Sequence, residues 1–153
     1  MRTLLKVLLL IAGAAIAARV SALVISKQLD EGSEGSDEFR RVVILSGIDF
    51  ASQAGGLRDV EVSVTLGGAK LDLRGATIDP AGARVLAQNT MGGLLIIVRD
   101  DWAVSVDDTL IGGGDSQVEV TPIDELPGDA PRLQIDVVTR MGGTVISTKR
   151  QDW

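Results

Sequence analysis

The chain has 153 residues, 45% of them hydrophobic but only 3% aromatic, and a formal net charge of −6. It has no cysteine and no histidine, which excludes disulfides, cysteine nucleophiles, His-dependent triads and the usual zinc sites. The negative charge argues against nucleic acid as a partner, because phosphate binding needs clustered lysine and arginine.

Residues 3–26 are almost wholly apolar. A helix of this length, at about 1.5 Å per residue, reaches about 36 Å and is long enough to cross a bilayer. We therefore expect residues 1–27 to form a single-pass anchor in the cell membrane that contacts lipid through residues 3–26. Arg19 must then lie near an interface or face a partner, since arginine at the centre of a membrane helix costs about 2.5 to 3.5 kcal/mol. Basic residues on both sides of the segment give no clear orientation.

The same segment has two other interpretations. In a secretory signal, residues 1–6 would be the basic region, residues 7–18 the apolar region and Val20-Ser21-Ala22 the cleavage site. In the third interpretation the segment is a peripheral amphipathic helix. Cleavage would release the rest of the chain as an exported module.

Residues 28–40 form an acidic segment. Its central run, Asp-Glu-Gly-Ser-Glu-Gly-Ser-Asp-Glu at residues 30–38, contains no apolar side chain and cannot bury anything. We expect a flexible, solvated linker that holds the following domain clear of the lipid.

Strand patterns dominate residues 41–150. Residues 60–66 alternate strictly between apolar and polar, and residues 71–73 and 134–139 continue this pattern in part. Turn residues interrupt the strands at 79–82, 99–101 and 127–131. The pattern predicts a mainly β domain without a long amphipathic helix.

A glycine motif that precedes an aliphatic run recurs along this domain. Its second positions are separated by 21, 25, 20 and 30 residues, a spacing typical of stacked supersecondary units. We therefore predict a β-solenoid, a single-stranded β-helix-like repeat domain, with a β-sandwich as the alternative. At least one glycine of each pair should have a positive φ or lack room for a Cβ, and Gly93 should tolerate valine less well than Gly143. The predicted turn glycines are Gly47, Gly67, Gly68, Gly92, Gly93, Gly112, Gly113, Gly142 and Gly143.

Two predictions concern side chains near the middle of the domain. The two-residue period of a strand should point Ile96 and Val98 into the core and Ile97 to the opposite face, partly covered by an edge or partner. Trp102 should either cap the end of a core ladder or stand exposed as an interface residue.

No residue pattern indicates catalysis. Asp100, Asp101, Asp107 and Asp108 bracket Trp102 and have the oxygen ligands that a hard cation prefers, but solvated acidic loops are the commoner explanation. The run Gly112-Gly113-Gly114-Asp115 has neither the spacing of a calcium-binding β-roll nor that of a dinucleotide fingerprint. We expect no catalytic, cofactor-binding or metal-binding residues.

Several of these motifs together resemble a known family. Leu-Gly-Gly-Ala-Lys-Leu-Asp-Leu at residues 66–73, the strand at 91–98, Trp102-Ala103-Val104 and Ile111-Gly112-Gly113 resemble the C-terminal domain of LiaF-type proteins, the "cell wall-active antibiotics response" family. The resemblance implies a domain that hangs from the membrane and restrains a sensor kinase responding to envelope damage. This chain departs from the family in having one candidate span, and in having Arg99 or Asp100 where the family has proline.

The sequence thus predicts a non-enzymatic, membrane-anchored β-repeat protein that acts through contacts with a membrane or signalling protein. The resemblance adds a role in the envelope stress response. A bactofilin-like scaffold that forms homo-oligomers by stacking its terminal coils is the structural alternative. An exported binding module is the third hypothesis.

Overall fold

The computed structural model of the chain describes residues 18, 20–22, 24–25 and 27–149. Within these residues the protein is mainly β, with ten strands and one short 3-10 helix. The strands are β1 (Glu38–Ile44), β2 (Gly47–Ala51), β3 (Asp59–Thr65), β4 (Gly68–Asp72), β5 (Ala83–Thr90), β6 (Gly93–Ile97), β7 (Ala103–Ile111), β8 (Asp115–Glu119), β9 (Arg132–Arg140) and β10 (Gly143–Ser147), and the 3-10 helix η1 (Ile123–Glu125) follows β8.

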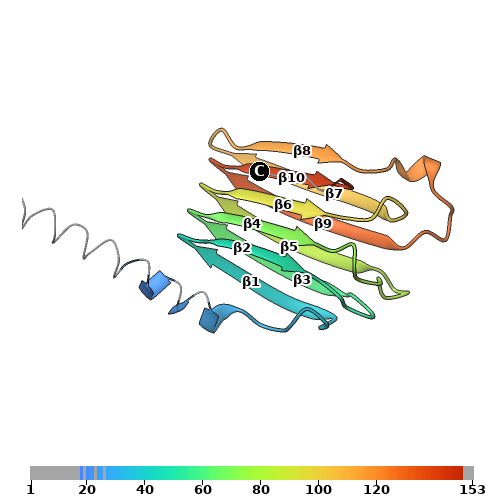
Figure 1. Cartoon of the computed structure of the whole chain (residues 1–153). Helices are drawn as coiled ribbons and strands as arrows, with labels where there is room; N and C mark the ends of the chain where they lie inside the picture. The colour runs from blue at the N-terminus through green and yellow to red at the C-terminus, as the bar shows by residue number, and fades with distance from the viewer. Residues whose placement is uncertain (1–17, 19, 23, 26, 150–153) are drawn as a thin grey trace, which may run out of the picture.

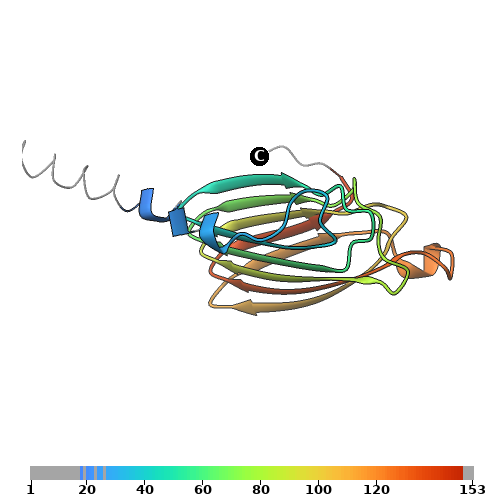
Figure 2. The same ribbon diagram turned by 90° about the horizontal axis from the view of Figure 1, so that it is seen from below.

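The strands form two five-stranded sheets in which every neighbouring pair is parallel. Each odd-numbered strand turns a tight corner into the next strand, which joins the other sheet, so the two sheets lie face to face (Figures 1 and 2). We call these five strand pairs coils 1 to 5: β1–β2, β3–β4, β5–β6, β7–β8 and β9–β10.

The coils do not stack in chain order. The sheets have the orders β1-β3-β5-β9-β7 and β2-β4-β6-β10-β8, so coil 5 lies between coil 3 and coil 4 (Figure 1). A solenoid adds each coil onto the preceding one, and the prediction of a β-solenoid is therefore wrong. The glycine motif does mark repeated units, because each coil contains one motif and pairs in parallel with its neighbours. Residues 120–131, however, lead the chain from the end of β8 back to the position beside coil 3.

The inward-facing residues explain why coil 4 lies at the end of the stack. Asp108 of β7 pairs in register with Val137 of β9, whose side chain is buried in the core. In a central coil, Asp108 would be an unpaired carboxylate between the sheets, and burying such a charge carries a large free-energy cost. Coil 5 presents Leu133, Ile135 and Val137 on the same face and is suited to the interior.

A small polar network joins coil 3 to coil 5 in the interior. The side-chain amide of Asn89 donates to the carbonyl oxygen of Gly143 at 2.8 Å and to the hydroxyl of Thr144 at 3.2 Å. The hydroxyls of Thr139 and Thr144 lie 2.8 Å apart, and all three side chains are buried. Because Leu110 of coil 4 pairs in register with Thr139, coil 4 would bring an alkyl group to the position beside Asn89.

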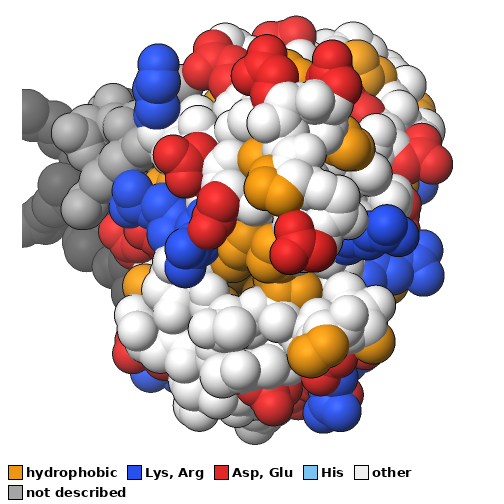
Figure 3. Space-filling model, turned by 90° about the vertical axis from the view of Figure 1, so that its right-hand side faces the viewer, with side chains coloured by type: hydrophobic (Ala, Val, Ile, Leu, Met, Phe, Trp, Pro, Cys, Tyr) orange, Lys and Arg blue, Asp and Glu red, His pale blue; other side chains and the backbone are white. Residues whose placement is uncertain are grey.

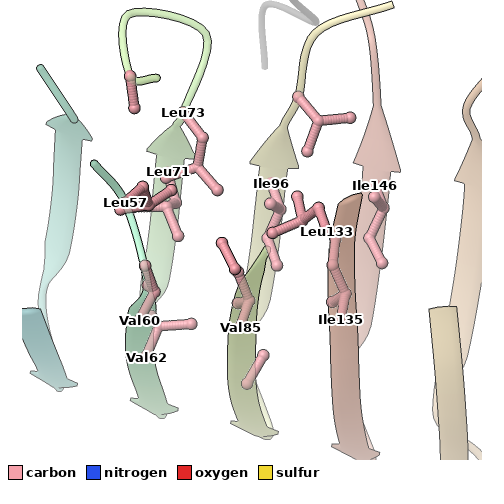
Figure 4. Close-up of a cluster of buried hydrophobic side chains, with 14 of the residues drawn as sticks. Leu57, Val60, Val62, Leu71, Leu73, Val85, Ile96, Leu133, Ile135 and Ile146 are labelled. Carbon is pink, nitrogen blue, oxygen red and sulfur yellow. The ribbon is translucent and has the colours of Figure 1, made fainter. Parts of the chain in front are cut away.

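The core between the sheets consists almost entirely of aliphatic side chains from both layers (Figure 4). Ile96 and Val98 belong to this core and are fully buried, which confirms their predicted orientation. Ile97 lies outside the core cluster and is also fully buried, so it is covered more completely than predicted.

The corner between the two strands of a coil explains the first glycine of each pair. A Cβ on Gly92 would lie 2.5 Å from the carbonyl oxygen of Gly67 in the preceding coil, and one on Gly142 would lie 2.5 Å from that of Gly92. These carbonyls accept the amide of the second glycine of the next coil, at 3.0 Å for Gly93 and 2.9 Å for Gly143. The corner therefore requires glycine wherever another coil packs against it, and Ser46 is tolerated in coil 1 because no coil precedes it.

The second glycines are not the demanding positions. A Cβ on Gly93 or Gly143 would meet no atom within 4 Å, and coil 5 has a neighbouring coil on both sides. The missing neighbour on which their predicted difference in valine tolerance depends is therefore not found at Gly143. Positive φ occurs one residue before the first glycine position, at Leu45, Leu66, Met91 and Met141, with values between 48° and 53°. Among the five corners, only that of coil 4 places glycines, Gly112 and Gly113, in this region.

The acidic segment is not the expected free linker over its whole length. Glu31 and Arg40 form an antiparallel bridge with amide-to-carbonyl distances of 3.0 and 2.9 Å, and the amide of Val42 donates to Asp30 Oδ1 at 2.7 Å. Gln53 donates its amide to the Glu34 carbonyl at 2.6 Å. Residues 30–37 therefore cover the outer side of coil 1.

The predicted anchor at residues 3–26 lies mostly outside the described residues. The described residues between 18 and 29 are helical, up to Leu29, and precede the covering segment at the corner end of the sheets (Figures 1 and 2). In the part of the chain that the structure describes, no helix is both long and apolar enough to cross a membrane.

Candidate functional site

The outer side of coil 4 is the least covered part of the two sheets. β7 and β8 are the terminal strands, and among the described residues no strand pairs with their outer edges. β7 has nine residues, and its burial falls off after Val104. Such an edge presents a row of unpaired backbone N–H and C=O groups that can pair with a strand of another chain. We call the outer side of β7 and β8, including their inward-facing residues, the edge-coil surface.

Apolar side chains that belong to the core face remain accessible on this surface. Leu110 is 49% exposed and Val118 43% exposed, although their register partners Thr139 and Ile146 are fully buried. Val106 and Val120 are only partly buried and pack against the core. On the edge-coil surface, apolar side chains of the core face are thus left without a further strand to cover them.

The same surface is acidic. Residues 103–125 contain no lysine or arginine, and their six acids are Asp107, Asp108, Asp115, Glu119, Asp124 and Glu125. Figure 3 looks onto the loop end of the molecule and shows acidic side chains gathered in its upper part, on the side of β8. An apolar strip with only negative charge around it selects a partner that is apolar and basic.

The opposite end of the stack differs because it is covered. The Arg41 guanidinium lies 4.1 Å from the ring centroid of Phe50 and 5.6 Å from that of Phe39. Its Nη1 donates to the carbonyl of Glu31 at 3.0 Å, and its Nη2 donates to that of Gly32 at 3.2 Å. Only 7% of Arg41 is exposed, so the covering segment encloses the β1 side of coil 1, whereas nothing comparable covers β7 of coil 4 among the described residues.

A groove of about 680 Å³ lies on the outer face of the first sheet near Arg58, Arg84 and Arg132. Arg58 pairs with Glu38 at 3.1 Å, and the Nε of Arg84 donates to Asp136 at 2.6 Å. Hydrogen bonds from Gln134 and then from Arg84 lower the pKa of Asp136. Since two of its arginines are neutralised, the groove does not concentrate positive charge.

The aspartates considered as cation ligands are not brought together as a metal site. Among the residues that the structure describes, no cluster of three or more acidic side chains could hold a metal ion. Asp101 instead binds Arg99, with nitrogen-to-oxygen distances of 2.7 and 2.8 Å, and this hydrogen bonding raises the pKa of Arg99. Asp107 and Asp108 lie on opposite faces of β7.

Trp102 lies immediately before β7 and is 2% exposed within the hydrophobic core. The interface interpretation of Trp102 is therefore wrong, because its indole is not accessible to a partner. The predicted turn glycines all lie at the corners between paired strands, away from the edge-coil surface except for Gly112 and Gly113, which connect β7 to β8.

The edge-coil surface is not among the sites predicted from the sequence. A signal is present, because residues 103–125 lack basic residues and place Asp108 and Leu110 in one alternating series with Val104 and Val106. That series shows that the inner face of β7 is not uniformly apolar. Without the coil order, however, the sequence does not place this strand at an end of the stack.

No family model matches the chain, and comparisons with curated proteins and with solved structures found no match. The resemblance to LiaF-type proteins stays a prediction based on its motifs.

Proposed function

We propose that the protein is a non-enzymatic interaction module, held at a membrane by its apolar N-terminal segment, that binds another protein through the edge-coil surface. The observation that supports this most is the asymmetry of the stack. Residues 30–37 cover coil 1, whereas coil 4 exposes two strand edges and core-facing Leu110 and Val118.

The partner in this proposal is an extended segment that carries lysine or arginine beside apolar residues. Its backbone pairs with the nine-residue edge of β7 and thus extends the sheet. Its apolar side chains cover Leu110 and Val118, while its basic side chains approach Asp107 on the opposite face of β7. Asp108, on the same face as Leu110, adds negative charge at the same edge. In an envelope-stress pathway, as the family resemblance implies, this segment would belong to a membrane signalling protein.

Stacking into a scaffold is a weaker candidate. Two edge-coil surfaces brought together would oppose like charges, which is destabilising. Head-to-tail stacking would require coil 1 to lose residues 30–37 and the carbonyl contacts of Arg41. Among the described residues, a basic strand approaching β7 would have to displace no such covering segment.

The test uses the full chain in neutral micelles and three fluorescent ten-residue peptides in which valine alternates with lysine, glutamate or serine. We expect the lysine peptide to bind, with an affinity that falls as salt rises. Asp108→Lys should weaken this binding strongly, while Glu61→Lys, on the outer face of β3, should leave it unchanged. Equal binding of all three peptides, or equal effects of the two variants, would refute the proposal.

A further inference from the structure

A second surface of unusual character lies along the corners where each coil turns from one sheet to the other. One apolar residue is exposed there in each of coils 1, 2, 3 and 5: Leu45 at 37%, Leu66 at 46%, Met91 at 51% and Met141 at 58%. We call these four side chains the corner row. Neighbouring strands lie about 4.8 Å apart, so these four adjacent coils give a row about 14 Å long.

The conformation of these residues makes their identity unexpected. Leu45, Leu66, Met91 and Met141 have positive φ, a region that costs side chains other than glycine, asparagine and aspartate free energy. Neither solvent exposure nor backbone geometry favours leucine or methionine at such a position. An apolar environment around the row would account for the choice of leucine and methionine at exposed positions.

The backbone of the corners is suited to a medium without water. The amides of Leu66 and Met91 donate to carbonyls of the next coil at 3.0 and 2.8 Å. The amides of Gly68, Gly93 and Gly143 donate to carbonyls of the adjacent coil at 2.9 to 3.0 Å. The first and third amides of these corners are therefore already bonded within the protein, and such bonding is what a backbone at a lipid boundary requires.

We infer that the corner row rests on the surface of the lipid bilayer. The helical residues between 18 and 29 lie at this same end of the molecule, and the apolar stretch of the sequence precedes them (Figures 1 and 2). A row of exposed apolar side chains fits the fluid apolar surface of a bilayer. Arg140, exposed beside Met141, is placed to meet a lipid phosphate.

This contact would fix the orientation of the domain. The odd-numbered strands end at the corners and the even-numbered strands begin there, so the sheets would stand on the bilayer (Figure 1). The loop end, with its acidic side chains, would point away from it (Figure 3). The edge-coil surface would then face sideways, parallel to the membrane. The inference concerns a different surface from the edge-coil surface and rests on the part of the proposed function that holds the chain at a membrane.

The absence of cysteine allows a direct test with the full chain. Met91→Cys and Leu86→Cys place one environment-sensitive fluorophore each on the corner row and on the outer face of β5, where Leu86 is 42% exposed. In phosphatidylcholine vesicles we expect a blue shift and quenching by lipid-borne nitroxide at position 91, and neither at position 86. Adding Leu66→Asn and Met141→Asn should reduce the quenching at position 91 while circular dichroism stays unchanged, because asparagine tolerates positive φ.

Each contrary result overturns the inference. Equal responses at the two positions in vesicle-bound protein would show that the row does not contact lipid. A response at position 91 in vesicle-free solution that rises with protein concentration would assign the row to a second copy of the chain. Failure of the full chain to bind vesicles would refute both the lipid contact of the row and the anchor.

Discussion

Arg41 and Asp108 occupy the two ends of one column of inward-facing residues, with Val62, Ala87 and Val137 between them. The charge of Arg41 is enclosed by carbonyl oxygens and two phenyl rings. Asp108 is exposed on the edge strand β7. The column therefore ends in a buried positive charge at coil 1 and a solvent-exposed negative charge at coil 4.

The position of Asp108 predicts that it limits self-association. Inward-pointing charges on edge strands are one way in which proteins prevent edge-to-edge pairing. Asp108→Val should complete an apolar strip with Leu110 and Val118 and produce larger species in size-exclusion chromatography with light scattering. Asp107→Val removes the same charge from the opposite face of β7 and should have a much smaller effect. Identical elution of the two variants would contradict this role.

Arg41 should hold the covering segment in place. Hydrogen bonds to charged groups contribute about 1.5 to 3 kcal/mol, so we expect Arg41→Met to lower the free energy of unfolding by about that amount. Hydrogen exchange at the amides of Glu31 and Arg40, which bond across the bridge, should accelerate more than exchange in β5. Unchanged exchange at these two amides would show that the segment is held by other contacts.

Two adjacent glycines provide a test of the corner geometry. A Cβ on Gly92 would lie 2.5 Å from a backbone carbonyl oxygen and 2.9 Å from a methyl group of Val64, whereas one on Gly93 would meet nothing within 4 Å. Gly92→Ala should therefore destabilise the domain by about 2 kcal/mol or more, and Gly93→Ala by less than about 1 kcal/mol. Thermal denaturation monitored by circular dichroism measures both. A larger loss for Gly93→Ala would mean that the carbonyl ladder does not limit the corner.

The mainly β class and the repeat units can be predicted from the sequence because alternation and recurring glycines act locally. The order of the coils cannot be predicted from the sequence, because it depends on which coil tolerates a neighbouring coil on both of its sides. The choice rests on Asp108, which cannot occupy the interior, and on Asn89, whose side-chain amide bonds to Gly143 and Thr144 of coil 5. The prediction that one glycine of a pair lacks room for a Cβ is confirmed at Gly92 and Gly142. The predicted valine effects, however, concern the second glycine, whereas the limiting contact is between the first glycine and the carbonyl of the neighbouring coil.

The acidic segment differs from its prediction for a similar reason. Its composition matches that of a flexible linker, but its backbone and Asp30 supply hydrogen-bond acceptors to coil 1. The composition of the segment indicates that it buries no apolar surface. The composition does not show which hydrogen bonds its backbone can form with the domain. The edge-coil surface cannot be predicted from the sequence, because exposure of Leu110 and Val118 follows only from the position of coil 4.

Asp72 should make a small, pH-dependent contribution to stability. Its hydrogen bonds with Arg74, at 2.9 and 2.7 Å, lower the pKa of Asp72. A lowered pKa stabilises the folded state above the unfolded pKa of about 3.9, and this stabilisation is lost as the pH falls through the folded value. Because Arg74 is partly exposed, we expect Asp72→Asn to cost about 0.5 to 1 kcal/mol between pH 5 and 8.

Urea denaturation of the parent and Asp72→Asn across this pH range measures the difference. It should shrink below pH 4 and vanish once the parent carboxyl is protonated. A difference that stays constant down to pH 2 would mean that the carboxylate charge is not responsible.

The most direct test of strand addition at coil 4 is hydrogen exchange of the full chain, in micelles, with and without the alternating lysine–valine peptide. If the peptide adds a strand to coil 4, amides in β7 and β8 become protected while those of β1 and β2 stay unchanged, and Asp108→Lys abolishes the protection. Protection at coil 1, or uniform protection of all strands without a change in β7, would contradict the claim that the edge-coil surface is the binding site.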